Sequence, residues 1–119
     1  MTILMNNDRG LIITQYSTIR QDDTNITDIL YFICPANYLD YNVTLYYKLP
    51  NDEVHEVVLE PDEELYKGCI KLTLPTAEDF TKYDGNVSMK LVLTKGIETL
   101  TSGEVFIEVL KNPEYEVTP

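Results

Sequence analysis

A strict alternation of apolar and polar residues in the last third of the chain limits its fold more than any other feature. In the segment 87–94 every second residue is large and apolar, namely Val87, Met89, Leu91 and Leu93. After a turn at Lys95-Gly96 the alternation returns with Val105, Ile107 and Val109. Because successive side chains of a strand point to opposite faces, this period indicates strands with one buried face. The chain is therefore expected to end in two long antiparallel strands.

Short apolar segments separated by turn residues occupy most of the remaining chain. Strands are expected at 11–13, 26–34, 43–49, 54–60 and 66–74, with clusters of Pro, Asn and Asp between them. About seven short strands at this spacing predict an all-β, immunoglobulin-like antiparallel β-sandwich, with a jelly roll as the alternative. At most one short helical turn is expected, at 76–83, where Thr76 is placed to cap it.

The alternation within these strands also predicts which side chains are buried. The expected inward-facing residues are Val43, Leu45, Tyr47, Leu49, Ile70, Leu72 and Leu74. The pattern of segment 54–60 is ambiguous, and we favour Val57 and Leu59 as its buried residues. Segment 28–34, DILYFIC, is apolar on both faces. Its outer face is therefore expected to be covered by a loop or a partner, unless Tyr31 simply faces solvent.

Length and charge restrict the domain organisation and the partners. The 119 residues fit one domain, expected over residues 1–111, with 112–119 as a C-terminal tail or linker. The 20 acidic and 9 basic residues give a net charge of −11, which repels nucleic acid and anionic membrane surfaces. The sequence shows no signal peptide and no membrane-spanning segment. Neither nucleic acid nor a membrane is therefore an expected partner.

Residues of catalytic type are scarce. His55 is the only histidine, and it lies mid-strand beside Glu56, where a solvent-facing side chain is the simpler interpretation. The carboxylates form no glycosidase or metal motif, so we expect no enzymatic activity, metal or cofactor. The segment from Asp22 to Asp28, DDTNITD, offers several oxygen ligands for calcium. It lacks the regular spacing and the glycine of a calcium loop, so an ordinary turn is favoured.

The two cysteines, Cys34 and Cys69, are too few for a disulfide framework. We expect them to be reduced core residues, with a Cys34–Cys69 bridge as the alternative. The chain has no Trp, and its cysteines do not fall where they would bridge the two sheets of an antibody domain. An antibody-like receptor domain is therefore disfavoured.

Two segments resemble a known domain family. They are LPTAEDFTKYDGNVSMKLVL, residues 74–93, and IETLTSGEVFIEV, residues 97–109. Their order of a strand ending in Leu-Pro, a short turn, a Gly before a long strand, and a last strand after Thr-Ser is similar to the N-terminal immunoglobulin-like domain of phage baseplate upper proteins. The similarity spans most of residues 9–110. It implies the sandwich fold and a place in a phage particle, assembled in the host cytoplasm. Family members usually continue into a receptor-binding region, whereas this chain stops at Pro119, so docking is the expected role.

Three functional hypotheses follow from this resemblance and from the scarcity of catalytic residues. The first is a phage virion structural protein that docks onto the tail, baseplate, neck or capsid, with other phage structural proteins or a second copy of itself as partner. The second is a carbohydrate- or host-surface-binding module, with Tyr38, Tyr41 and Tyr46 as the contact platform. The third is a small enzyme, which the single histidine disfavours.

The loop PANYLDYN, residues 35–42, is the best candidate for a partner-binding site. It places Tyr38, Leu39 and Tyr41 in a connection between two strands, where a purely structural turn needs no such apolar residues. The alternative interpretation is that these side chains fold back and close one end of the sandwich.

Overall fold

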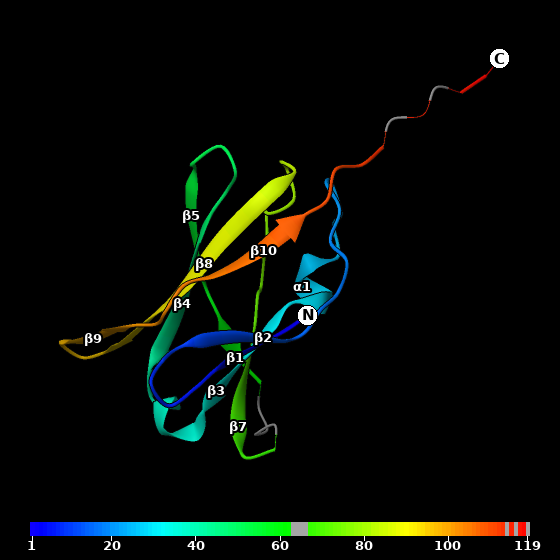
Figure 1. Ribbon diagram of the computed structural model, residues 1–119. Coiled ribbons are helices and arrows are strands. Elements are labelled where there is room, and N and C mark those ends of the chain that lie inside the picture. Colours follow the sequence, from blue (N-terminus) through cyan, green and yellow to red (C-terminus); the bar gives the residue numbers. More distant parts are fainter. Residues whose placement is uncertain (63–66, 114, 116, 119) are drawn as a thin grey trace.

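Two β-sheets packed face to face make up the computed structural model, which describes residues 1–62, 67–113, 115, 117 and 118 (Figure 1). In spatial order the first sheet contains β2 (Leu11–Gln15), β1 (Thr2–Met5), β3 (Tyr31–Pro35), β7 (Cys69–Thr73) and β6 (Glu60–Pro61). The second contains β10 (Val105–Val109), β8 (Gly85–Lys95), β4 (Asn42–Lys48) and β5 (Val54–Val58), with β9 (Glu98–Thr101) also paired to β8. The predicted all-β sandwich is confirmed.

The strand order is that of an immunoglobulin-type sandwich. The order β1-β3-β7-β6 in one sheet and β4-β8-β10 in the other matches the two sheets of a constant-type domain, and β5 is added beyond β4. One pair departs from the antiparallel rule, because β1 runs parallel to β3. A further parallel bridge joins Arg20 to Leu110, at the end of β10.

The core lies between the sheets and contains the side chains that alternation predicted. In β4 and β8 the inward-facing residues are all buried, and these are Val43, Leu45, Tyr47, Val87, Met89, Leu91 and Leu93. Leu49, Ile70, Leu72 and Leu74 are buried as well. Val57 and Leu59 are also buried, so the preferred register of that segment is confirmed.

The N-terminal part of the chain differs most from expectation. Strand β1 was not expected, because its apolar residues do not alternate; it is held by pairing with β2 and with the distant β3. The strand expected at 26–34 starts only at Tyr31, and α1 (Ile26–Ile29) takes its first residues. The backbone N–H of Leu30 donates to the Ile26 carbonyl at 3.0 Å. Ile26, Ile29 and Leu30 follow helical spacing, which is the signal that the strand interpretation overlooked.

The prediction of a helical turn at 76–83 is wrong. This segment consists of bends and turns, in which Asp79 has a φ of 64° and so interrupts any helical run. Phe80 next to it is fully buried. The segment therefore serves to place an aromatic side chain in the core. A second short helical element, the 3₁₀ turn η1 (Ala36–Tyr38), follows β3 instead.

Two other expected strands are divided. The segment 54–60 forms β5 in one sheet and crosses at Leu59 to β6 in the other. The final strand is split into β9 and β10, which pair with different halves of β8. The strand expected at 66–74 begins at Tyr66, which lies outside the described residues; β7 covers its later part. The described residues beyond Leu110 lie outside both sheets and lead away from them (Figure 1).

Candidate functional site

The loop after β3 is folded into two consecutive tight turns. The backbone N–H of Leu39 donates to the Ala36 carbonyl at 3.1 Å, and that of Tyr41 donates to the Tyr38 carbonyl at 3.0 Å. These bonds turn neighbouring side chains in different directions: Tyr38 is 7% exposed, whereas Leu39 is 56% exposed. Of the three predicted site residues, Leu39 is thus the one that faces solvent most fully.

Tyr38 and Tyr41 are brought together and close one end of the sandwich. Their rings meet edge to face, with centroids 5.4 Å apart and an angle of 68° between the planes. Below them is a cavity of about 170 Å³, lined also by Cys34, Leu59 and Leu72. For Tyr38 the structure therefore supports the end-closing interpretation, while Tyr41 is only partly buried.

The hairpin of β8 and β9 lies beside this loop. Lys95 Nζ is 3.9 Å from Asp40 Oδ2 and 5.6 Å from the centroid of the Tyr41 ring. A hydrogen bond between the Tyr41 hydroxyl and the Glu98 carboxylate raises the pKa of Tyr41. Ile97, at the turn between the two strands, is fully exposed. We call Leu39, Tyr41, Lys95, Ile97 and Glu98 the hairpin-tip surface.

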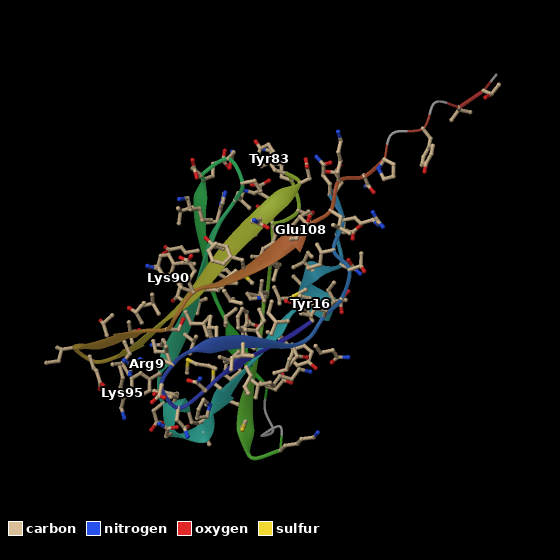
Figure 2. The ribbon with its side chains drawn as sticks, viewed as in Figure 1. Arg9, Tyr16, Tyr83, Lys90, Lys95 and Glu108 are labelled. Atoms are coloured by element: carbon tan, nitrogen blue, oxygen red, sulfur yellow. The ribbon has the colours of Figure 1, made fainter. Side chains whose placement is uncertain are left out.

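The base of this hairpin is braced by the turn between β1 and β2. Arg9 Nε donates to the Thr101 carbonyl at 3.3 Å, and the backbone N–H of Gly103 donates to the Arg9 carbonyl at 2.8 Å. A Cβ at Gly103 would lie 3.6 Å from the Gly10 Cα, so the two backbones are nearly in contact. Figure 2 shows Arg9 and Lys95 at the same end of the molecule. The hairpin-tip surface thus rests on hydrogen-bonded backbone from both sheets.

The sequence pattern predicts the loop half of this surface but not the hairpin half. Gly96 and Ile97 form the two-residue turn between β8 and β9, and Gly96 has a φ of 59°. Ile97 is an isolated apolar residue in this turn. A single large apolar residue at the tip of a hairpin is the signal that was available in the sequence.

In the segment from Asp22 to Asp28, for which calcium was the alternative, two oxygens of Asp23 are engaged in the fold. Asp23 Oδ2 accepts a hydrogen bond from the Arg20 N–H at 2.9 Å, and the Asp23 carbonyl accepts one from Thr81 Oγ1 at 2.7 Å. Residues of this segment and of 75–82 together line a groove of about 530 Å³. Within the described ranges no group of three or more His, Cys, Asp or Glu is arranged to hold a metal ion. The geometry is that of a capped turn.

The sequence favoured a solvent-facing His55. In the structure this side chain is partly buried. It lies opposite Tyr47 in the β4–β5 ladder, and the two rings stack with centroids 5.5 Å apart. Its Nε2 is 3.3 Å from Glu53 Oε2. The reason is register, because His55 takes the inward-facing position at the rim of the core. Tyr47 in turn donates its hydroxyl hydrogen bond to the Glu78 carbonyl at 2.9 Å.

Both cysteines carry free thiols. Cys34 is fully buried between the sheets, and burial together with the nearby Cys69 raises the pKa of its thiol to about 12. Such a thiol stays protonated and behaves as a small apolar core residue.

No protein-family model and no curated protein matches the sequence. No helix among the described residues has the length and hydropathy needed to cross a membrane.

Proposed function

We propose that the chain is a non-enzymatic structural module of a phage virion and that it docks onto tail, baseplate, neck or capsid proteins through the hairpin-tip surface. The observation that supports this proposal is that two elements joined by the ion pair of Lys95 and Asp40 each carry one exposed apolar side chain, Leu39 and Ile97. The phage context comes from the sequence resemblance of residues 74–109.

The composition of the hairpin-tip surface is that of a small docking site. Contact energy in protein interfaces concentrates in a few apolar or aromatic residues surrounded by polar ones. Leu39, Tyr41 and Ile97 supply the apolar part, and Lys95 and Glu98 supply charged groups of both signs at its edge. Since the supporting backbone is hydrogen-bonded on both sides, little ordering entropy has to be lost on binding.

The test is incorporation into particles. A tagged chain with Ile97→Asp and Leu39→Ser is expected to be missing from purified phage particles, because a charge and a lost apolar contact fall at the centre of the docking site. The parent chain is expected to be present, as measured by mass spectrometry or immunogold labelling. Both residues are exposed, so the double variant is expected to melt within a few degrees of the parent.

A matched control is Val54→Asp, at an exposed apolar position on β5. Incorporation of this variant should equal that of the parent. Normal incorporation of the hairpin-tip variant would contradict the proposed docking site, and absence of the parent chain from particles would contradict the virion role itself.

A carbohydrate-binding role is the second candidate, and one surface favours it. Tyr46 lines a shallow groove of about 230 Å³ on the outer face of the second sheet, together with Lys48, Ser88, Lys90 and Glu104. An aromatic ring flanked by donors and acceptors suits a sugar ring. Figure 2 shows Lys90 on the same strand pair, and its Nζ lies 5.8 Å from the Tyr46 ring centroid. Loss of binding to host wall glycan in Tyr46→Ala would support this role, and absence of glycan binding by the parent would exclude it.

A further inference from the structure

The second sheet ends in an open strand. β5 is its last strand on the side away from β10, and among the described residues β5 pairs only with β4 (Figure 1). The outer strands of the first sheet are better protected. β6 is two residues long and contains Pro61, and the start of β2 lies beside Gly103, at which a Cβ would be 3.8 Å from the Leu11 nitrogen. β5 contains neither the Pro nor the Lys that commonly blocks pairing at a sheet edge.

Hydrogen bonds at both ends of the β4–β5 ladder show which backbone groups face the open edge. The Glu53 carbonyl accepts a hydrogen bond from the Leu49 N–H at 2.8 Å, and the Leu59 N–H donates to the Val43 carbonyl at 2.9 Å. Every second residue of an antiparallel strand bonds to the same neighbour, so the odd-numbered residues of β5 bond to β4. The residues whose N–H and C=O groups face the open edge are therefore Val54, Glu56 and Val58.

The same three residues carry the exposed side chains of this strand. Val54 is 62% exposed and Val58 is 58% exposed, and the Glu56 side chain between them is exposed as well. A strand laid against this side of the sheet would thus meet free backbone groups and the pattern apolar, acidic, apolar. We call Val54, Glu56 and Val58 the β5 edge.

We propose that the β5 edge binds an extended segment of another protein, which adds to the second sheet as a further strand and carries a basic residue between two apolar ones. In such strand addition the main-chain hydrogen bonds supply affinity and the alternate side chains supply specificity. Side chains directly opposite one another on paired strands interact, and opposite charges stabilise the pair. Lys or Arg opposite Glu56, with apolar residues opposite the two valines, gives the best fit. This inference goes beyond docking through the hairpin-tip surface and does not rest on it.

Charge also argues against a second copy of this chain as the occupant. The antiparallel register that pairs all of β5 with its own copy places Glu56 opposite Glu56, and like charges directly opposite one another are destabilising. The net charge of −11 adds a long-range repulsion between two copies. The same charge attracts a basic segment.

The probe is the peptide Thr-Val-Thr-Lys-Thr-Val-Thr, blocked at both ends, because as a strand it presents Val, Lys and Val on one face. Isothermal titration calorimetry with the full chain is expected to show binding that weakens as salt concentration rises. Replacing Lys by Glu in the peptide should weaken binding at least about tenfold. With the Lys peptide bound, amide hydrogen exchange should slow at Glu56 and Val58, whose N–H groups face the open edge, and change little at Val57, which already bonds to β4.

Three variants test the two parts of the proposal. Glu56→Lys should reverse the preference, so that the Glu peptide binds better than the Lys peptide. Glu108→Lys, at an exposed position of β10, is the matched control, because it changes the net charge equally and leaves β5 intact. It should keep the preference of the parent. Val58→Pro removes an N–H that β4 does not use, so it should abolish binding in a chain that thermal melts show to be folded.

A parent that does not bind the Lys peptide, or that binds both peptides equally well, would overturn the proposal. Binding that survives Val58→Pro, or a preference that reverses in Glu108→Lys, would do the same. Ile97→Asp should bind the Lys peptide as the parent does, and incorporation into particles is not expected to depend on the β5 edge. Failure of virion docking is therefore distinguishable from failure of strand addition.

Discussion

At the scale of single residues, Tyr38 and Leu39 are neighbours in sequence with opposite roles. Tyr38 is held in the core by its contact with Tyr41 and covers the cavity at the end of the sandwich. Leu39 points into solvent from the same 3₁₀ turn. The function of the loop is therefore divided: one residue stabilises the fold and the next is free for contact.

This division predicts different stability effects for the two residues. Tyr38→Ala is expected to lower the free energy of unfolding by about 3–5 kcal/mol, because a buried aromatic side chain leaves a cavity. Leu39→Ala is expected to change it by less than about 0.5 kcal/mol. Urea denaturation followed by circular dichroism measures both. Equal effects of the two substitutions would show that Tyr38 does not close the core.

At the scale of elements, the long strand β8 is the axis of the second sheet. Its first half pairs with β10 and its second half with β9, while β4 runs along its other edge. The change of partner occurs at Ser102, whose Oγ accepts a hydrogen bond from the Leu91 N–H at 2.7 Å and whose own N–H donates to the Leu91 carbonyl at 2.9 Å. A side chain thus replaces a ladder bond where the hairpin leaves the sandwich.

Removal of this side-chain bond should loosen the hairpin. Ser102→Ala leaves the backbone N–H of a fully buried residue, Leu91, without its acceptor. A cost of about 1–3 kcal/mol in the free energy of unfolding is expected. Amide hydrogen exchange should accelerate at Leu91 and along β9. Thr99→Ala, at an exposed position of β9, is the control and should leave both quantities near those of the parent.

At the scale of the whole molecule, burial makes the fold sensitive to alkaline pH. Burial raises the pKa of Tyr47, and burial with the nearby Cys69 raises that of Cys34 to about 12. For an acid whose pKa is higher in the folded state, the folded state holds its proton more tightly than the unfolded chain does. The stabilisation is complete below the unfolded pKa, and it is lost as pH rises above that value.

The expected result is a melting temperature that declines as pH rises above about 9, where unfolded cysteine begins to ionise. Thermal melts from about pH 8 to about pH 11 measure this decline. A Cys34→Ala variant is less stable at neutral pH, because it has a smaller core side chain, but its decline should be shallower. A constant melting temperature over this range in the parent would mean that these groups ionise equally easily in both states.

The local pattern of the chain determined the two-sheet class and most of the core. Alternation identified the inward residues of β4, β7 and β8 correctly, because the side-chain direction in a strand depends only on position along that strand. The same rule identified DILYFIC as apolar on both sides, although its first residues, Asp28 and Ile29, belong to α1.

Only the tertiary structure decided where strands begin, end and change partner. β1 is paired with β2 and with the distant β3, and between β9 and β10 the backbone N–H of Gly103 donates to the Arg9 carbonyl of the other sheet's β1–β2 turn. The candidate site was decided in the same way: the loop was visible in the sequence, but its contact with the β8–β9 hairpin, through Asp40 and Lys95, joins residues far apart in the chain. Pairing partners far apart in the chain leave no local periodicity, and so no sequence pattern could show them.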